Sequence, residues 1–80
     1  MTDWSPTERI EEAVARAWHG EEVLREVIYL HLRRRYRVKV WEEGGRSVEA
    51  TIDGSLACSE ANLEAALVTT IEAMRREWKA

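Results

Sequence analysis

The sequence has no phenylalanine, one cysteine, one proline and four glycines among its 80 residues. Because Cys58 is the only cysteine, an intramolecular disulfide is excluded, and this usage fits a reducing cytoplasm. No apolar run approaches the roughly 20 residues that a membrane-spanning helix needs. Residues 1–6 lack a basic segment followed by an apolar one, so we expect no secretion signal.

The length and composition predict a single compact domain over residues 1–80, and the helices and strands predicted below place it in the α+β class. A chain of this length buries only about 60–65% of the surface that its unfolded state exposes, which leaves a thin core and no deep substrate cleft. Apolar residues make up 45% of the sequence and charged residues 34%, as in folded soluble domains rather than disordered tails. Four tryptophans provide large apolar surfaces with a polar N–H, which suits both cores and interfaces.

A first helix is predicted from about residue 6 to residue 18. Ser5 suits the N-cap, Pro6 suits the first helical position, and Glu8 completes a capping box. Apolar residues then recur with helical spacing at Ile10, Ala13, Val14, Ala17 and Trp18.

A second helix is predicted from about residue 21 to residue 34. Its buried side consists of Leu24, Val27, Ile28, His31 and Leu32. Apolar residues also occur at every second position at 28, 30 and 32, in step with the alternation that follows from Tyr36. The alternative is therefore a strand that begins before residue 35. We prefer the helix because Glu21 and Glu22 favour a helix start and Leu24 fits the 3.6-residue period.

Two alternating runs on either side of Glu43-Gly44-Gly45 predict a β-hairpin, the first of them starting near residue 35. A three-residue loop sets the register, because the apolar residues of both strands must share one face. The core-face pairs are Val40–Val48, Val38–Ala50 and Tyr36–Ile52. The pairs on the other face are Trp41–Ser47, Lys39–Glu49, Arg37–Thr51 and Arg35–Asp53, of which two join opposite charges.

A final helix begins after Ser59, a good N-cap, with Glu60 near its positive end. Its apolar stripe is Leu63, Leu67, Thr70, Ile71, Met74 and Trp78. Residues 55–58 either add a short strand or connect the hairpin to this helix. The expected architecture is α-α-β-β-α, with the helices packed on one face of a small antiparallel sheet.

Charge is segregated along the chain. Residues 33–46 carry six bases and two acids, whereas residues 1–32 carry seven acids and three bases. The bases form a basic island of Arg33, Arg34, Arg35, Arg37 and Lys39, which is a candidate nucleic-acid-binding strand. Glu49 and Asp53 lie opposite this strand and the net charge is −3, so we weight direct nucleic-acid binding below a neutralised sheet face.

The residue types that carry metal or nucleophilic chemistry are sparse. His19, His31 and Cys58 show no metal-ligand spacing, and no histidine is predicted beside Cys58 to activate it. We therefore expect no metal, no cofactor and no enzymatic activity.

Protein binding is the function that the residues favour. In the predicted register Trp41 lies on the solvent face beside acids, as an interface anchor does. The candidate partner-binding residues are Glu8, Glu11, Glu12, Glu21, Glu22, Trp41, Glu42, Glu43, Glu49 and Asp53. A homodimer through the outer sheet face or the second helix is also compatible with so small a domain.

In size, acidity, layout and lack of catalytic residues, the chain is similar in profile to phage-encoded anti-CRISPR proteins. Arg- and Trp-rich segments such as Met74-Arg75-Arg76-Glu77-Trp78 suggest a GC-rich bacterial or phage genome. The resemblance implies a cytoplasmic inhibitor in a bacterial cell, which binds a CRISPR effector complex or another basic nucleic-acid-binding protein as a DNA mimic does. Anti-CRISPR families share no general motif, so the resemblance assigns no individual residue.

Overall fold

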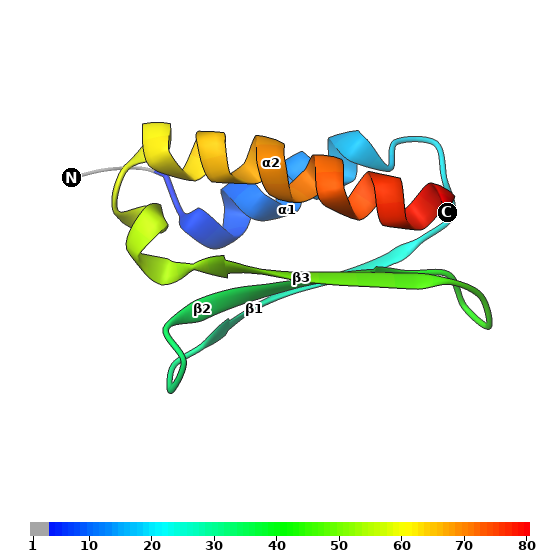
Figure 1. The fold of residues 1–80 in the computed structure, drawn as a ribbon, viewed down its shortest axis with the longest axis horizontal. Coiled ribbons are helices and arrows are strands. Elements are labelled where there is room, and N and C mark those ends of the chain that lie inside the picture. The colour runs from blue at the N-terminus through cyan, green and yellow to red at the C-terminus, as the bar shows by residue number, and fades with distance from the viewer. Residues whose placement is uncertain (1–3) are drawn as a thin grey trace.

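The computed structural model describes residues 4–80 of the chain, so the predicted absence of a secretion signal lies partly outside it. The elements are α1 (Pro6–Ala17), β1 (Leu24–Leu30), β2 (Arg35–Trp41), β3 (Ser47–Asp53), the 3-10 helix η1 (Gly54–Cys58) and α2 (Glu60–Lys79). The three strands form an antiparallel sheet in the order β1-β2-β3, and both long helices cover the same face of it (Figure 1). The α+β class is therefore confirmed, with the element order helix, three strands, helix.

The predicted helix over residues 21–34 is wrong, because residues 24–30 form β1 and residues 31–34 form a turn. β1 pairs with β2 along its whole length, from Leu24 opposite Trp41 to Leu30 opposite Arg35. The run Val27-Ile28-Tyr29 is β-branched and aromatic, which favours a strand. Leu24 and Val27 point to opposite faces of the sheet, so their spacing does not reflect a helical stripe.

The hairpin register predicted for residues 35–53 is confirmed at all seven pairs. Glu42 N–H donates to the carbonyl of Arg46 at 2.9 Å and closes the loop, where Gly44 adopts a positive φ of 73°. Glycine adopts this left-handed conformation without strain because it has no Cβ that would clash with the backbone. The turn chemistry and the buried alternation therefore agree on one register.

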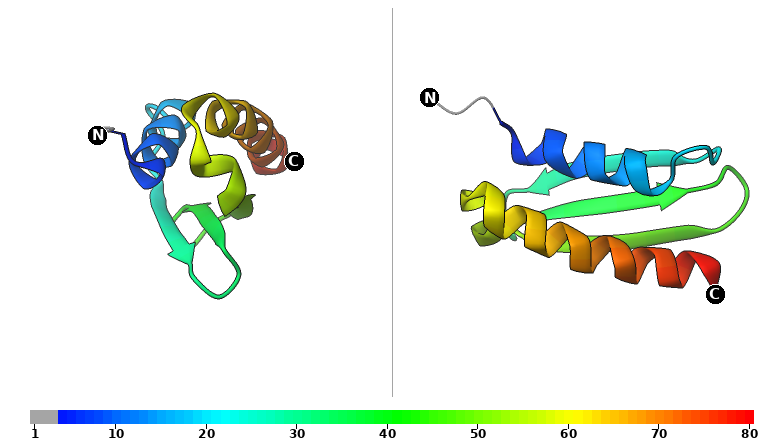
Figure 2. Two further views of the ribbon diagram at one scale, coloured as in Figure 1. Left: turned by 90° about the vertical axis from the view of Figure 1, so that its left-hand side faces the viewer. Right: turned by 90° about the horizontal axis from the view of Figure 1, so that it is seen from above.

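Both helices begin at the predicted N-caps. Ser59 Oγ accepts a hydrogen bond from the backbone N–H of Asn62 at 3.2 Å. Ser5 occupies the N-cap of α1 without a side-chain cap hydrogen bond, so the predicted capping box is not formed. The two helices run in the same direction, which places both N-termini at one end of the molecule (Figures 1 and 2).

The core lies between the helical layer and the inner face of the sheet. Its fully buried side chains include Ile10 and Val14 of α1, Val38 and Val40 of β2, and Trp78 of α2. Trp18 packs edge to face against Trp78, with ring centroids 5.8 Å apart. No helix within residues 4–80 combines the length and apolar character that crossing a membrane requires.

A tight connection joins the sheet to α2. Residues 54–58 form η1, so they are the connection rather than the strand that the sequence left open. Gly54 N–H donates to the carbonyl of Arg34 at 2.8 Å, and Arg34 itself adopts a φ of 52°. Asp53 Oδ1 accepts from the backbone N–H of Ser55 at 2.9 Å and caps η1. Cys58 is the last residue of η1, and its side chain is exposed to solvent.

The cap at Asp53 predicts a pH-dependent stability. The Ser55 N–H holds the pKa of the Asp53 carboxyl below its ordinary value near 3.8. Because the folded state binds this proton more weakly than the unfolded state, the stabilisation is present above about pH 4 and is lost as the pH falls toward the lowered pKa. Asp53→Asn should therefore unfold at lower urea concentration than the wild type at neutral pH, with a smaller difference near pH 3.

The matched control is Glu43→Gln, in the exposed hairpin loop. It should unfold like the wild type at both pH values. A difference between wild type and Asp53→Asn that did not change with pH would contradict the role given to the ionised carboxylate.

Candidate protein-binding site

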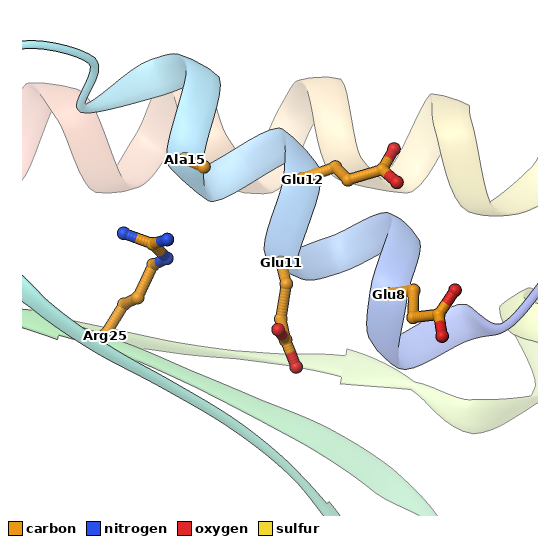
Figure 3. A pocket seen from close by; sticks show the side chains of 5 residues that line it. All are labelled: Glu8, Glu11, Glu12, Ala15 and Arg25. Carbon is orange, nitrogen blue, oxygen red and sulfur yellow. The ribbon is translucent and has the colours of Figure 1, made fainter.

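One side of α1 is lined with carboxylates. Glu8, Glu11, Glu12 and Ala15 recur at helical spacing, while Ile10 and Val14 are buried in the core. Together with Arg25 of β1 they surround a shallow hollow of about 300 Å³ (Figure 3). Figure 3 shows Glu11 pointing toward the sheet and Arg25 rising from its strand toward α1.

A second hollow, of about 360 Å³, continues the first along β1. Glu11 and Arg25 line both, and the second adds Val23, Leu24 and Val27. We call the two together the α1–β1 groove. Its upper wall is acidic, and its lower wall is the edge strand β1 with apolar side chains.

The three carboxylates of the groove have no cationic partner among residues 4–80. Glu8, Glu11 and Glu12 are all exposed, and the ion pairs of the described chain involve other acids. Arg9 of the same helix reaches away from the groove to Glu60, at 2.7 Å. Of the residues from Trp4 onward, Arg25 is the one cation that lines the groove, so the field of these residues in the groove is negative.

The structure assigns Glu21 a structural role instead. Its Oε2 lies 2.8 Å from Nη1 of Arg75, and its Oε1 accepts a hydrogen bond from Nε1 of Trp78 at 3.2 Å. These contacts hold the segment after α1 against the end of α2. Glu21 is therefore already satisfied within the fold, and the sequence did not reveal this because its partners lie more than 50 residues away.

The other predicted acids are spread over the molecule. Glu42 pairs with Arg46 at 3.0 Å, and that hydrogen bond lowers the pKa of the Glu42 carboxyl. Glu49 lies 3.9 Å from Nε of Arg37, and Asp53 caps η1. Glu22 and Glu43 are exposed in loops outside the groove.

Trp41 lies on the open face of the sheet, as predicted, and is half-buried. The ammonium of Lys39 sits 5.2 Å from its ring centroid, and Leu24, which is 47% exposed, is its neighbour on β1. The helices cover the opposite face, so the structure does not bring Trp41 together with the α1 carboxylates (Figure 1). Leu24 lies between the two surfaces, because it lines the α1–β1 groove and is also paired with Trp41 across the strands.

The basic island is divided into two parts. On β2, the Arg37 guanidinium lies 3.1 Å from Glu26 and 3.9 Å from Glu49, so the strand part is neutralised by acids on both neighbouring strands. Lys39 lies opposite Glu49 and Arg35 lies opposite Asp53, as predicted. The ion pair to Glu49 nevertheless comes from Arg37, which is the diagonal neighbour of Glu49 on β2. Arg33, Arg34 and Arg35 remain exposed at the turn between β1 and β2.

The lower wall of the groove was missing from the predicted site. Val23, Leu24, Arg25 and Val27 were assigned to a helix, and the alternation of Ile28 and Leu30 was the signal that pointed to a strand. No group of three or more His, Cys, Asp or Glu side chains among residues 4–80 is placed to hold a metal ion. No protein-family model, no curated protein and no solved structure matches the chain.

Proposed function

We propose that this chain is a non-enzymatic binding protein that captures a basic protein surface in the α1–β1 groove. The observation that carries the proposal is the row of Glu8, Glu11 and Glu12, exposed and without ion pairs within residues 4–80, above an exposed strand. Charged groups that are already paired within a fold offer little to a partner. These three retain their full charge for an intermolecular contact.

The groove combines two features that serve different steps of binding. The negative field of the carboxylates accelerates encounter with a positive partner and disfavours acidic ones. The apolar side chains of Val23, Leu24 and Val27 can then be buried on contact, which slows dissociation. The faster encounter and the slower dissociation both require a partner that carries lysine or arginine beside apolar residues.

Such a partner fits the resemblance to anti-CRISPR proteins. A bacterial CRISPR effector, or another basic nucleic-acid-binding protein, holds phosphates with lysine and arginine side chains. A row of carboxylates that occupies these side chains would block the nucleic acid by competition. The proposed inhibitor would act in the bacterial cytoplasm, with Trp41 and the sheet face as a second contact beyond Leu24.

Neutralising the groove is expected to weaken binding to a basic probe by about 30-fold, since three exposed ion pairs contribute together about 2 kcal/mol. The variant is Glu8→Gln, Glu11→Gln and Glu12→Gln together, and the probe is a fluorescent heptapeptide with Lys at odd positions and Val at even positions. The matched control is Glu43→Gln, Glu72→Gln and Glu77→Gln, exposed acids that lie outside the groove. Both variants change the net charge from −3 to zero.

Anisotropy titrations at low and physiological salt separate the possible results. Equal losses in the two variants would show that net charge rather than the groove attracts the probe, and would overturn the proposal. The same two variants, used as baits in a nuclease-treated bacterial lysate, test the inhibitor role. An RNA-guided effector retained by wild type and control but lost by the groove variant is the expected result.

Direct nucleic-acid binding is the alternative, and the exposed Arg33, Arg34 and Arg35 at the β1–β2 turn favour it. Beside them lies a hollow lined by Tyr29, His31 and Arg33 among others, in which the rings of Tyr29 and His31 pack edge to face with centroids 4.9 Å apart. Arg33→Ala with Arg34→Ala should then lower affinity for a labelled single-stranded oligonucleotide and reduce its salt dependence. No measurable oligonucleotide affinity in the wild type would exclude this alternative.

A further inference from the structure

We propose that β1 binds an extended segment of the partner as a fourth strand of the sheet, with basic side chains of that segment beneath the carboxylates of α1. The inference rests on the proposed function and adds how the partner is held. Strand addition of this kind takes affinity from main-chain hydrogen bonds and specificity from alternate side chains.

Among residues 4–80, the β-ladder pairs one alternate set of β1 peptide groups with β2 and leaves the other set without a strand partner. The hydrogen bond from Glu42 N–H to the Arg46 carbonyl, at 2.9 Å, is the last rung between β2 and β3. Rungs of an antiparallel ladder recur at every second residue, so the even-numbered residues of β2 bond to β3 and its odd-numbered residues bond to β1. On β1, the residues whose N–H and C=O groups face outward are therefore Arg25, Val27 and Tyr29.

This outward edge carries few of the features that usually prevent strand pairing. β1 is seven residues long, contains no proline and has charged side chains at Arg25 and Glu26. Within residues 4–80 the sheet order ends at β1, and α1 packs above the strand (Figure 2). A long edge with mostly apolar side chains is a template for another strand.

The charge of the groove specifies the occupant. Side chains of an added strand alternate between the two faces of the sheet, about 6.7 Å apart on each face. Successive turns of α1 place carboxylates about 5.4 Å apart along the helix, which flexible lysine or arginine side chains can match. The other set of side chains would lie beside Ile28 and Leu30 on the open face. The occupant is therefore a segment that alternates basic and apolar residues.

A second copy of β1 does not meet this requirement. Its residues on the helical face are Arg25, Val27 and Tyr29, a single base. Its arrival would also bring a second row of Glu8, Glu11 and Glu12 toward the first. A foreign basic segment is favoured over the chain itself by charge alone.

The test uses the full chain and variants of the Lys-Val heptapeptide in which only backbone N–H groups change. One peptide carries N-methyl groups on its interior lysines and another carries them on its valines. In an added strand, one alternate set of N–H groups faces β1 and the other faces solvent. We expect methylation of one set to weaken binding about 30-fold and methylation of the other set to weaken it less than about 3-fold. A block peptide, with four lysines followed by three valines, should bind as weakly as the sensitive methylated one.

The results distinguish a failure of the strand-addition proposal from a failure of the proposed function. Equal binding of all peptides, with the dependence on Glu8, Glu11 and Glu12 retained, would overturn strand addition and leave the proposed function standing. Loss of that dependence on the carboxylates would overturn both.

Amide hydrogen exchange supplies a second readout. The N–H groups of Arg25, Val27 and Tyr29 should exchange more slowly when the heptapeptide is bound, whereas those of Glu26 and Ile28 should not change. Unchanged exchange at all five amides with saturated peptide would contradict the proposal. Self-association of the chain without peptide, with the same three amides protected, would overturn it in favour of a homodimer.

Discussion

Replacing Trp78 with alanine is expected to remove most of the stability of the domain. The side chain is 2% exposed, packs edge to face on Trp18 at 5.8 Å, and lies under the Arg46 guanidinium at 4.4 Å. Its Nε1 donates to Glu21, which would lose that hydrogen bond. Truncating a buried tryptophan costs about 3–5 kcal/mol. A domain of this size has roughly that amount in total, so the variant should be largely unfolded at room temperature.

Urea unfolding followed by circular dichroism measures this effect. The matched control is Trp41→Ala, which removes the same side chain from the open face of the sheet. Because Trp41 makes its contacts at the surface, we expect its loss to cost about 1 kcal/mol or less. Similar losses in the two variants would contradict the assignment of Trp78 to the core and Trp41 to the open face.

The second large effect is expected at Gly54, where a single added methyl group has no space. A Cβ at this position would lie 2.7 Å from the carbonyl oxygen of Arg34, and backbone atoms cannot turn aside as a side chain does. Gly54→Ala should therefore push η1 away from the β1–β2 turn and weaken the hydrogen bond from Gly54 N–H to Arg34. Overpacking of this kind costs about 1–3 kcal/mol.

Gly45→Ala is the control for this prediction. Its Cβ would lie 2.8 Å from Oε1 of Glu42, an atom at the far end of a flexible side chain that can move, and 3.1 Å from the Glu42 Cβ, a contact that a small shift of the exposed loop relieves. The two variants introduce the same methyl group, and only the first should lower the urea midpoint substantially. A larger loss at Gly45 than at Gly54 would show that the turn, rather than the backbone contact, limits stability.

The hairpin was predictable because each of its strands buries one face. Val38 and Val40 face the core together with Val48 and Ile52, and a shift of one residue between the strands would turn the core residues of one strand to the open face. The glycine-containing loop independently required a short turn. Two constraints of different origin thus selected the same register.

β1 was not predictable in the same way because it is an edge strand with apolar side chains on both faces. Val27 and Tyr29 lie on the helical face, while Leu24, Ile28 and Leu30 lie on the open one, so the period of two is hidden. Long-range pairing with β2 decides the conformation, which a local pattern does not show.

The candidate site was predictable only as a row of charges. The spacing of Glu8, Glu11 and Glu12 identified one face of a helix, but their surroundings depended on the strand that was assigned wrongly. The groove exists because β1 lies below this row. Glu21 belongs to the same acidic segment of the sequence, yet its partners Arg75 and Trp78 come from the other end of the chain.

The position of the acidic row also bears on solubility. An exposed strand edge makes a protein prone to join copies of itself into larger sheets, a hazard in a crowded cell. Here Glu8, Glu11 and Glu12 stand above that edge, so two copies that approach edge to edge bring six carboxylates together and repel each other. The charge that we propose to attract a foreign basic segment would thus also oppose aggregation of the chain through β1.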